Sequence, residues 1–277
     1  MRFVDCHSHT LHYSTDATQT VDDLLSDAGE HRLAGICLTD HYDKDISYEQ
    51  GVENIFNLEH YFRHLQPIRE QTGKLPTRLL IGVELGWMPY LSELYSEIIH
   101  SWPFDSITLS LHVMDNDQDI CVSPRIYQDG IINCYSRALR QMVDMMRAVP
   151  DFTILGHYDY VSRYVPSQVV RMDYQPLADE FDALFRHLIA HGKALELNTR
   201  TTMKFQQIGI RGAAAWPDPA IFRRYRELGG EFVALSSDSH QIGQAASLFP
   251  DAVEFLTNAG FQQVVHFENQ TPVFTAI

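Results

Sequence analysis

The sequence has no hydrophobic run long enough to cross a membrane. No stretch of about 18 consecutive apolar residues occurs in it. The opening segment MRFVDCHSHT also has no apolar region of the kind that signal peptides carry. We therefore expect neither a membrane span nor a secretion signal, and we expect the protein to be cytoplasmic.

Positive charge is scarce as well. The chain has 21 Lys and Arg residues against 36 Asp and Glu residues, which gives a formal net charge of −15. Proteins that bind nucleic acid or anionic membranes need a basic surface. We therefore expect a small-molecule partner and no nucleic-acid or membrane partner, while nothing in the sequence sets the number of subunits. Bound divalent cations would reverse the sign of the charge locally.

Cysteine is rare and scattered. The four cysteines are Cys6, Cys37, Cys121 and Cys134, and no two form a C-x-x-C pair. This excludes a zinc ribbon and a thioredoxin-like redox site, and it favours the reduced thiols of a cytosolic protein. Low-complexity segments and Gly/Ser linkers are also absent, so we predict a single domain over residues 1–277.

The chain instead alternates short apolar runs with longer segments of helical periodicity. The runs that resemble buried strands are residues 3–7, 35–39, 78–84, 106–111, 153–156, 194–198 and 232–236. The helical segments are residues 21–31, 54–72, 131–149, 176–191 and 219–228, and Thr20 is a candidate N-cap for the first. This alternation predicts an α/β fold with a mostly parallel sheet, closed or nearly closed into a barrel. The tail from Phe261 is expected to add a last strand or a closing segment.

Polar residues follow nearly every predicted strand. They are His7 and His9, Asp40 and His41, Glu84, His112, His157, Arg200, and Asp238 and His240. In barrels of parallel strands, the C-terminal ends of the strands carry the chemistry. Residues i and i+2 of a strand point to the same side, so His7 and His9 can hold one cation between them. Imidazoles and carboxylates together suit zinc, iron or manganese, so the sequence predicts a metal cluster.

These motifs, taken in order, resemble the polymerase-and-histidinol-phosphatase superfamily of metal-dependent phosphoesterases. The matching segments are DCHSHTLHYSTD, LTDHYD, GVELG with SLH, LGHYDYVSRY and SSDSH. The resemblance implies a distorted, TIM-like (β/α)7 barrel that binds up to three divalent ions (Zn, Fe or Mn) at the C-terminal ends of its strands. It implies three ligand sets: His7, His9, Glu84 and Asp238; Glu84, His112 and His157; and His41, His240 and Asp16. His12 is the alternative to Asp16 in the third set.

The length and the segments LGHYDYVSRY and LELNTR are most similar to the histidinol-phosphate phosphatases. This resemblance implies a phosphomonoesterase that converts L-histidinol phosphate to L-histidinol and phosphate in histidine biosynthesis. Two metals bridged by Glu84 would share a water and lower its pKa to about 7, and the resulting hydroxide would attack phosphorus. The alternative is a related enzyme that acts on nucleotides or another phosphate ester. An amidohydrolase-type barrel also begins with H-x-H, but it usually needs a lysine where this chain has Glu84.

Several residues outside the ligand sets are candidates for substrate binding and proton transfer. Arg163 and Arg200 are predicted phosphate contacts, because a guanidinium pairs two hydrogen bonds with a phosphate. Asp159 or a metal-bound water is predicted to protonate the leaving group, and His41 is an alternative acid or base. Polar and aromatic residues of two long insertions are candidates for binding the cationic part of a substrate: Tyr42, Asp43, Tyr48, Asp115 and Asp117. His60 and His64 have i, i+4 spacing but lack the glutamate of an H-E-x-x-H motif, which favours a structural face.

Overall fold

Seven parallel strands form the wall of a barrel. The computed structural model describes residues 3–46, 53–115, 119–166 and 171–277. The strands are β1 (Val4–Asp5), β2 (Gly35–Leu38), β4 (Arg78–Gly86), β5 (Ser106–Ser110), β6 (Ile154–Leu155), β7 (Ala194–Asn198) and β8 (Val233–Ser236), hydrogen-bonded in that order. A short strand β3 (His41–Tyr42) pairs with β4 beyond the end of β2. The predicted strands are therefore confirmed.

The barrel closes between its first and last strands. The amide of Cys6 donates to the carbonyl of Leu235 at 3.1 Å, and the amide of Asp238 donates to the carbonyl of His7 at 3.0 Å. A parallel bridge between Ser8 and Ser239 continues this seam. These contacts join residues from opposite ends of the chain, so the predicted nearly closed barrel is confirmed.

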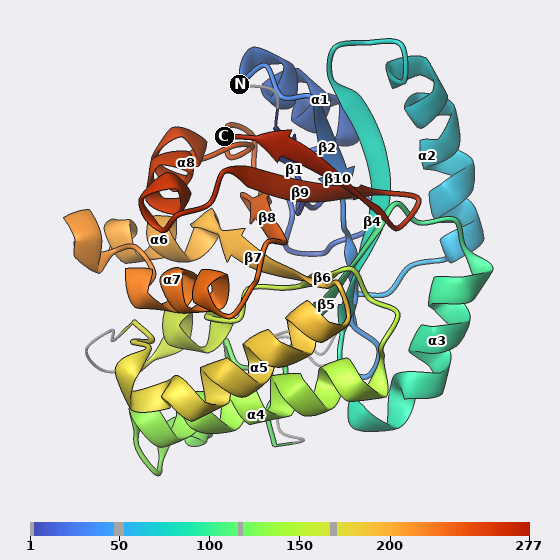
Figure 1. Ribbon diagram of the computed structural model, residues 1–277. Coiled ribbons are helices and arrows are strands. Elements are labelled where there is room, and N and C mark those ends of the chain that lie inside the picture. The colour runs from blue at the N-terminus through green and yellow to red at the C-terminus, as the bar shows by residue number, and fades with distance from the viewer. Residues whose placement is uncertain (1–2, 47–52, 116–118, 167–170) are drawn as a thin grey trace.

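Helices surround the strands on their outer side (Figure 1). They are α1 (Val21–Glu30), α2 (Leu58–Thr72), α3 (Ser92–Ser101), α4 (Ile131–Ala148), α5 (Ala178–Ala190), α6 (Thr199–Gln207), α7 (Pro219–Glu227) and α8 (Phe249–Asn258). Thr20 caps α1 as predicted, because its hydroxyl accepts from the amide of Asp23 while the Asp23 carboxylate accepts from the amide of Thr20. Within the described residues, none of these helices combines the length and apolarity that a membrane crossing requires. Helices α3, α6 and α8 were not predicted from the sequence; α6 is rich in threonine, which has low helix propensity.

The two faces of each strand have different neighbours. Along β4, Leu79, Ile81 and Val83 belong to the large apolar core that includes the helices. Leu80, on the opposite face, belongs to a separate cluster inside the barrel. Side chains alternate between faces along a strand, so Glu84 shares the inner face with Leu80 and lies nearer the C-terminal end. The barrel interior is therefore apolar at one end and carries Glu84 toward the other.

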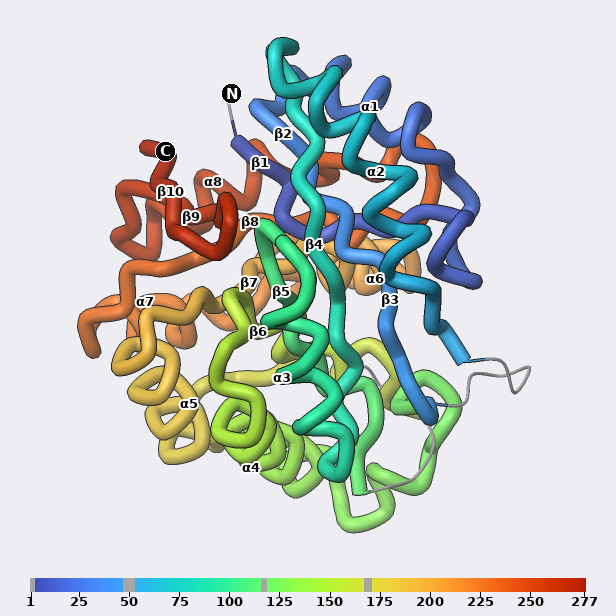
Figure 2. Tube along the Cα trace, turned by 90° about the vertical axis from the view of Figure 1, so that its right-hand side faces the viewer, coloured from blue at the N-terminus to red at the C-terminus, as the bar shows by residue number. Residues whose placement is uncertain are grey.

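A C-terminal hairpin closes the apolar end. Strands β9 (Gln263–Glu268) and β10 (Thr271–Ala276) pair antiparallel as a separate two-stranded sheet. Val265 and Phe267 of β9 pack into the inner cluster. The C-terminus lies on this side of the molecule in both views (Figure 1 and Figure 2). The sequence predicted either a last strand of the barrel or a closing segment for this tail. The structure shows a closing segment that does not join the barrel sheet.

Asp105 holds the hairpin turn against the barrel. This fully buried carboxylate accepts from the amides of Ile81 and Asn269, both at 2.9 Å, and pairs with Arg69 at 2.8 Å. We expect Asp105→Ala to lower the free energy of unfolding by about 3 kcal/mol, because it leaves buried donors and a partly buried guanidinium without an acceptor. Urea denaturation followed by circular dichroism measures this change. Asp251→Ala, at an exposed position of α8, is the control and should change stability by less than about 0.5 kcal/mol.

Candidate metal centre

The polar residues that follow the strands meet in one buried pocket. His7 and His9 follow β1, His112 follows β5, and Glu84 lies on β4; all four side chains are essentially buried. The other predicted ligands in the pocket are His41 in β3, His157 after β6, Asp238 and His240 after β8, and the more exposed Asp16. The structure therefore brings together every residue of the three expected ligand sets.

The first group is formed by His7, His9, Glu84 and Asp238. Glu84 Oε2 lies 3.3 Å from His7 Nε2 and 3.6 Å from His9 Nε2, and His9 Nε2 lies 3.5 Å from Asp238 Oδ1. Within the described chain, His7 Nε2, His9 Nε2 and Glu84 Oε2 are buried atoms without a hydrogen-bond partner. Such atoms are costly unless something satisfies them. Their chemistry and convergence fit a divalent cation.

The second group uses the other oxygen of Glu84. Glu84 Oε1 lies 2.8 Å from His157 Nε2 and 3.2 Å from His112 Nε2. One carboxylate thus faces two sets of histidines through its two oxygens. Burial by itself would raise the pKa of Glu84, but the neighbouring His7, His112 and His41 hold that pKa well below its usual range. Glu84 is therefore a carboxylate anion placed between two groups that can each hold a metal.

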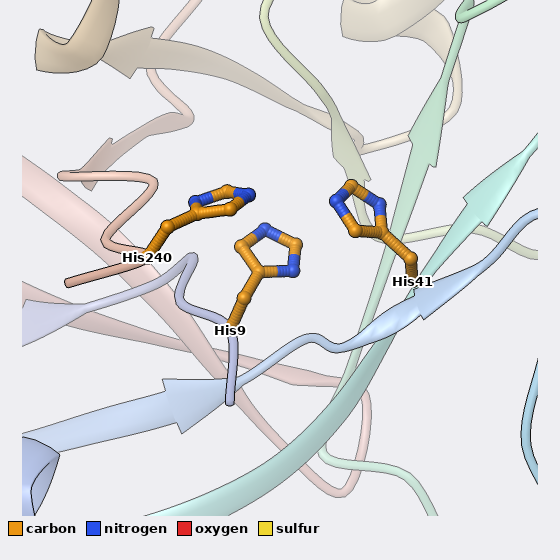
Figure 3. A group of neighbouring side chains, drawn as sticks. All are labelled: His9, His41 and His240. Carbon is orange, nitrogen blue, oxygen red and sulfur yellow. The ribbon is translucent and has the colours of Figure 1, made fainter. Parts of the chain in front are cut away.

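The third group lies at the mouth of the pocket. Figure 3 shows the rings of His9, His41 and His240 converging, and these three residues can hold an ion. Asp16 Oδ2 lies 3.0 Å from His240 Nε2, and Asp16 Oδ1 lies 3.7 Å from His41 Nε2. His12 instead lies beside His64, with ring centroids 5.6 Å apart. The geometry favours Asp16 over His12 as the ligand that completes this group with His41 and His240.

Two buried carboxylates, Glu196 and Asp43, lie behind the histidines, and of these Glu196 was missed as a functional residue. Glu196 Oε1 lies 2.8 Å from His7 Nδ1, and the other Glu196 oxygen accepts from the amide of His157. Asp43 Oδ1 lies 3.0 Å from His112 Nδ1, in a space that a Cβ at Gly86 would fill. A carboxylate on one ring nitrogen fixes the tautomer and aims the other nitrogen at a cation. The glutamate of the segment LELN, on the inner face of β7, is the feature from which Glu196 could have been predicted as a functional residue.

Asp43 was expected to be a candidate for binding a cationic substrate. The structure places it in a different role, because it is fully buried and contacts His112 and His41. Asp115 is exposed and pairs with Arg137. Tyr48 and Asp117, proposed for the same task, lie outside the described residues.

Both predicted phosphate contacts line the cavity at the metal centre, together with Tyr160, Tyr164 and the histidines at its mouth. Arg163 Nη1 pairs with Asp238 Oδ2 at 3.0 Å, while its buried Nη2 has no hydrogen-bond partner among the described residues. Arg200 Nη1 donates to the carbonyl of Asp238 at 2.6 Å. Lys204 lies one turn after Arg200, with its ammonium 5.4 Å from the centre of the Tyr164 ring. It was missed because α6 was not predicted.

Asp159 lies behind Arg163. Its carboxylate accepts from the Thr201 hydroxyl at 3.0 Å, and that hydroxyl in turn accepts from Arg163 Nε at 2.7 Å. Asp159 lines a separate small cavity beside Tyr158, and it is not among the residues that line the cavity at the metal centre. Burial raises the pKa of Asp159. This placement indicates that Asp159 orients Arg163 and does not donate a proton to the leaving group.

Glu196 offers a test of the supporting carboxylates. We expect Glu196→Gln to lower kcat/KM about 10–100-fold, because the amide holds His7 less firmly than a carboxylate does. Steady-state kinetics and elemental analysis of the purified variant measure the effect. Glu268→Gln, at the hairpin end of the barrel, is the matched control. Unchanged kinetics in Glu196→Gln would show that His7 does not depend on this contact.

Comparisons with known proteins agree with this geometry. The family model described as "PHP domain" matches residues 5–200. A probable histidinol-phosphatase of Clostridium acetobutylicum is 27% identical over 260 residues, covering 94% of this chain and 95% of the relative. The histidinol-phosphatase of Lactococcus lactis is 28% identical over 271 residues, covering 96% of this chain and 95% of the relative.

Solved structures share the fold. A crystal structure of histidinol phosphate phosphatase from Lactococcus lactis, complexed with zinc, L-histidinol and phosphate, superposes with a TM-score of 0.85 at 24% identity and covers 98% of this chain and 99% of that one. A putative histidinol phosphatase from Listeria monocytogenes gives a TM-score of 0.73 at 15% identity, with 90% of this chain and 99% of that one covered. The barrel, the converging histidines and the match of the family model over most of the chain lead to one conclusion: this protein belongs to the PHP domain family.

Proposed function

We propose that this chain is a metal-dependent phosphomonoesterase that hydrolyses L-histidinol phosphate to L-histidinol and phosphate. The observation that carries the proposal is the position of Glu84, whose two carboxylate oxygens face two groups of buried histidines. The relatives named histidinol-phosphatase, which match nearly the full chain, supply the substrate. Arg163 and Arg200 in the same cavity supply groups suited to a phosphate.

Up to three divalent ions, zinc, iron or manganese, are proposed for this site. His7, His9, Glu84 and Asp238 would hold the first, Glu84, His112 and His157 the second, and His41, His240 and Asp16 the third. When bound, such ions lower the pKa of a water and neutralise charge on a phosphoryl group. The buried His7 Nε2, His9 Nε2 and Glu84 Oε2, which lack hydrogen-bond partners among the described residues, support this donor set.

The protein's own side chains position the phosphate. Arg163 donates to Asp238 through Nη1 and to Thr201 through Nε. These two hydrogen bonds fix the orientation of Nη2, which has no hydrogen-bond partner among the described residues. A guanidinium held in this way donates to phosphate without losing further side-chain freedom. Arg200 lines the cavity, and the ammonium of Lys204 lies 5.4 Å from the centre of the Tyr164 ring, which also lines it. Burial lowers the pKa of Lys204, and the charges of Arg200 and Arg163 lower it further. A dianionic phosphate monoester would relieve this repulsion.

The cellular setting follows from the same features. We propose a cytoplasmic enzyme that acts on a small phosphorylated substrate and not on nucleic acid. All four cysteines are free thiols, and three are buried. The net charge of −15 disfavours binding to a polyanion.

Substrate comparison tests the proposal. Metal-loaded enzyme is assayed for phosphate release from L-histidinol phosphate and nucleoside monophosphates, and for cleavage of single-stranded DNA. We expect kcat/KM for L-histidinol phosphate to exceed that for any nucleotide by at least about 100-fold, because the site must recognise the alcohol part of its substrate. The Glu84→Ala variant, purified identically, reports contaminating phosphatase. Equal or greater turnover of nucleotides would favour the alternative, a PHP-family enzyme for another phosphate ester.

A further inference from the structure

Ser110 lies next to Glu84, at the end of β5. Its side chain is fully buried, and its hydroxyl oxygen lies 2.6 Å from Glu84 Oε1. A carboxylate anion has no proton to donate, so Ser110 donates this hydrogen bond. Within the described part of the chain, the other contacts of the Glu84 carboxylate are all with histidines. Ser110 is therefore a partner of the central carboxylate that is not itself in any of the proposed ligand sets.

The hydrogen bond from Ser110 fixes the plane of the Glu84 carboxylate. Charge-assisted O–H···O⁻ bonds are about 2.5–2.7 Å long and about twice as strong as bonds between neutral groups. The last torsion of a glutamate side chain is otherwise soft, because rotation about a bond to an sp² carbon has only a broad, two-fold preference. With Oε1 held toward Ser110, Oε2 is directed toward His7 and His9.

Strand pairing in turn holds the backbone of Ser110. Ser110 is opposite Gly86 in the register of β4 and β5, and its carbonyl accepts from the amide of Trp87 at 2.9 Å. A single torsion places the hydroxyl oxygen of a serine, so a fixed backbone leaves it only three staggered positions. The contact between Ser110 and Glu84 therefore follows from the register of the two strands.

Gly156, directly before His157, leaves the space that the Ser110 hydroxyl occupies. A Cβ at Gly156 would overlap Ser110 Oγ. The amide of Gly156 donates to the carbonyl of Leu109 at 3.0 Å, which keeps the end of β6 against β5. Gly156 is not among the glycines with a positive φ, so its backbone conformation does not require glycine and the lack of space does.

We propose that Ser110 is a positioning residue of the metal centre: its hydroxyl sets the orientation of the Glu84 carboxylate, and Gly156 leaves it room to do so. The inference rests on the proposed function in one respect, which is that Glu84 binds metal. Loss of a partner behind a metal ligand lowers metal affinity or activity by about 10–100-fold. Because Ser110 contacts Glu84 and does not line the cavity at the metal centre, the effect should fall on metal affinity.

Zinc titration of Ser110→Ala tests this role. Metal-free wild type, Ser110→Ala and the control Ser106→Ala are titrated with Zn²⁺ in competition with a chromophoric chelator. Ser106 begins β5 on the same face as Ser110, and its hydroxyl oxygen lies 2.9 Å from that of Thr153. We expect at least one zinc to bind about 10-fold or more weakly in Ser110→Ala, and Ser106→Ala to match wild type. Phosphatase activity of Ser110→Ala should recover as free Zn²⁺ is raised, which damage to the fold would prevent.

Gly156→Ala gives a second readout. The added methyl group displaces the Ser110 hydroxyl, so zinc affinity should fall by about the same factor as in Ser110→Ala. In the Ser110→Ala background the hydroxyl is already absent, and Gly156→Ala should weaken zinc binding by less than about 2-fold further. The methyl group also approaches Thr108 Cγ2 at 2.9 Å, and the strain from that contact is the same in both backgrounds.

Unchanged zinc affinity in Ser110→Ala, or losses that simply multiply in the double variant, would overturn the proposal. These titrations contain no phosphate ester. A failed assay with L-histidinol phosphate, obtained together with the expected zinc affinities, would therefore count against the proposed function alone.

Discussion

Glu84→Gln is expected to lower kcat/KM for L-histidinol phosphate by about 10³-fold or more, which corresponds to about 4 kcal/mol of transition-state stabilisation. The two oxygens of Glu84 face His7 and His9 on one side and His112 and His157 on the other. Glutamine has nearly the same shape but no negative charge, and it turns an amide group with two donors toward one of these groups. Both proposed metal positions are weakened by one substitution.

The measurement combines kinetics with metal content. Glu84→Gln should retain the circular dichroism spectrum of wild type and contain at least one fewer metal ion per chain by elemental analysis. Glu97→Gln, at an exposed position of α3, is the matched control and should behave as wild type. A Glu84→Gln enzyme that keeps a tenth or more of the wild-type activity would show that Glu84 does not bridge two ions.

Removal of metal is expected to abolish activity and to lower the Tm by about 10 °C for each ion removed. Ions present at about 1,000 times their dissociation constant contribute about 4 kcal/mol per site, and each kcal/mol corresponds to about 2–4 °C in a chain of this size. Without them, the buried carboxylates Glu84 and Asp238 are left facing histidine nitrogens that lack hydrogen-bond partners within the described chain. Histidine ligands must be deprotonated to bind a metal, so metal binding weakens as the pH falls and the shift should be smaller at lower pH.

Chelation followed by gel filtration gives the metal-free protein for this test. Differential scanning calorimetry and phosphate release are measured before and after metal is restored. Addition of Zn²⁺ or Mn²⁺ should recover both the Tm and the activity, whereas Na⁺ at equal ionic strength should recover neither. Full turnover by protein with no detectable metal would contradict the proposed chemistry, whatever its substrate.

Much of this arrangement can be predicted from local sequence. The strands of the barrel were predictable because β-branched and aliphatic runs of a few residues recur between helical segments. The polar residues after those strands were predictable as neighbours, because the C-terminal ends of parallel strands meet at one end of a barrel. The hairpin β9–β10 was harder, since its strands pair only with each other and its turn at Asn269 and Gln270 depends on contacts with the distant Asp105.

The sequence by itself determined which side chains stand at the ends of the strands, because alternation along a strand and helical periodicity are properties of neighbouring residues. Only the tertiary structure decided how those side chains meet. The contact of Glu196 with His7 spans 189 positions of the chain, and the choice of Asp16 over His12 depends on which of them reaches His240. Closure of the barrel between β1 and β8 sets these distances. Pairing between strands that are far apart in the chain cannot be predicted from the pattern of neighbouring residues.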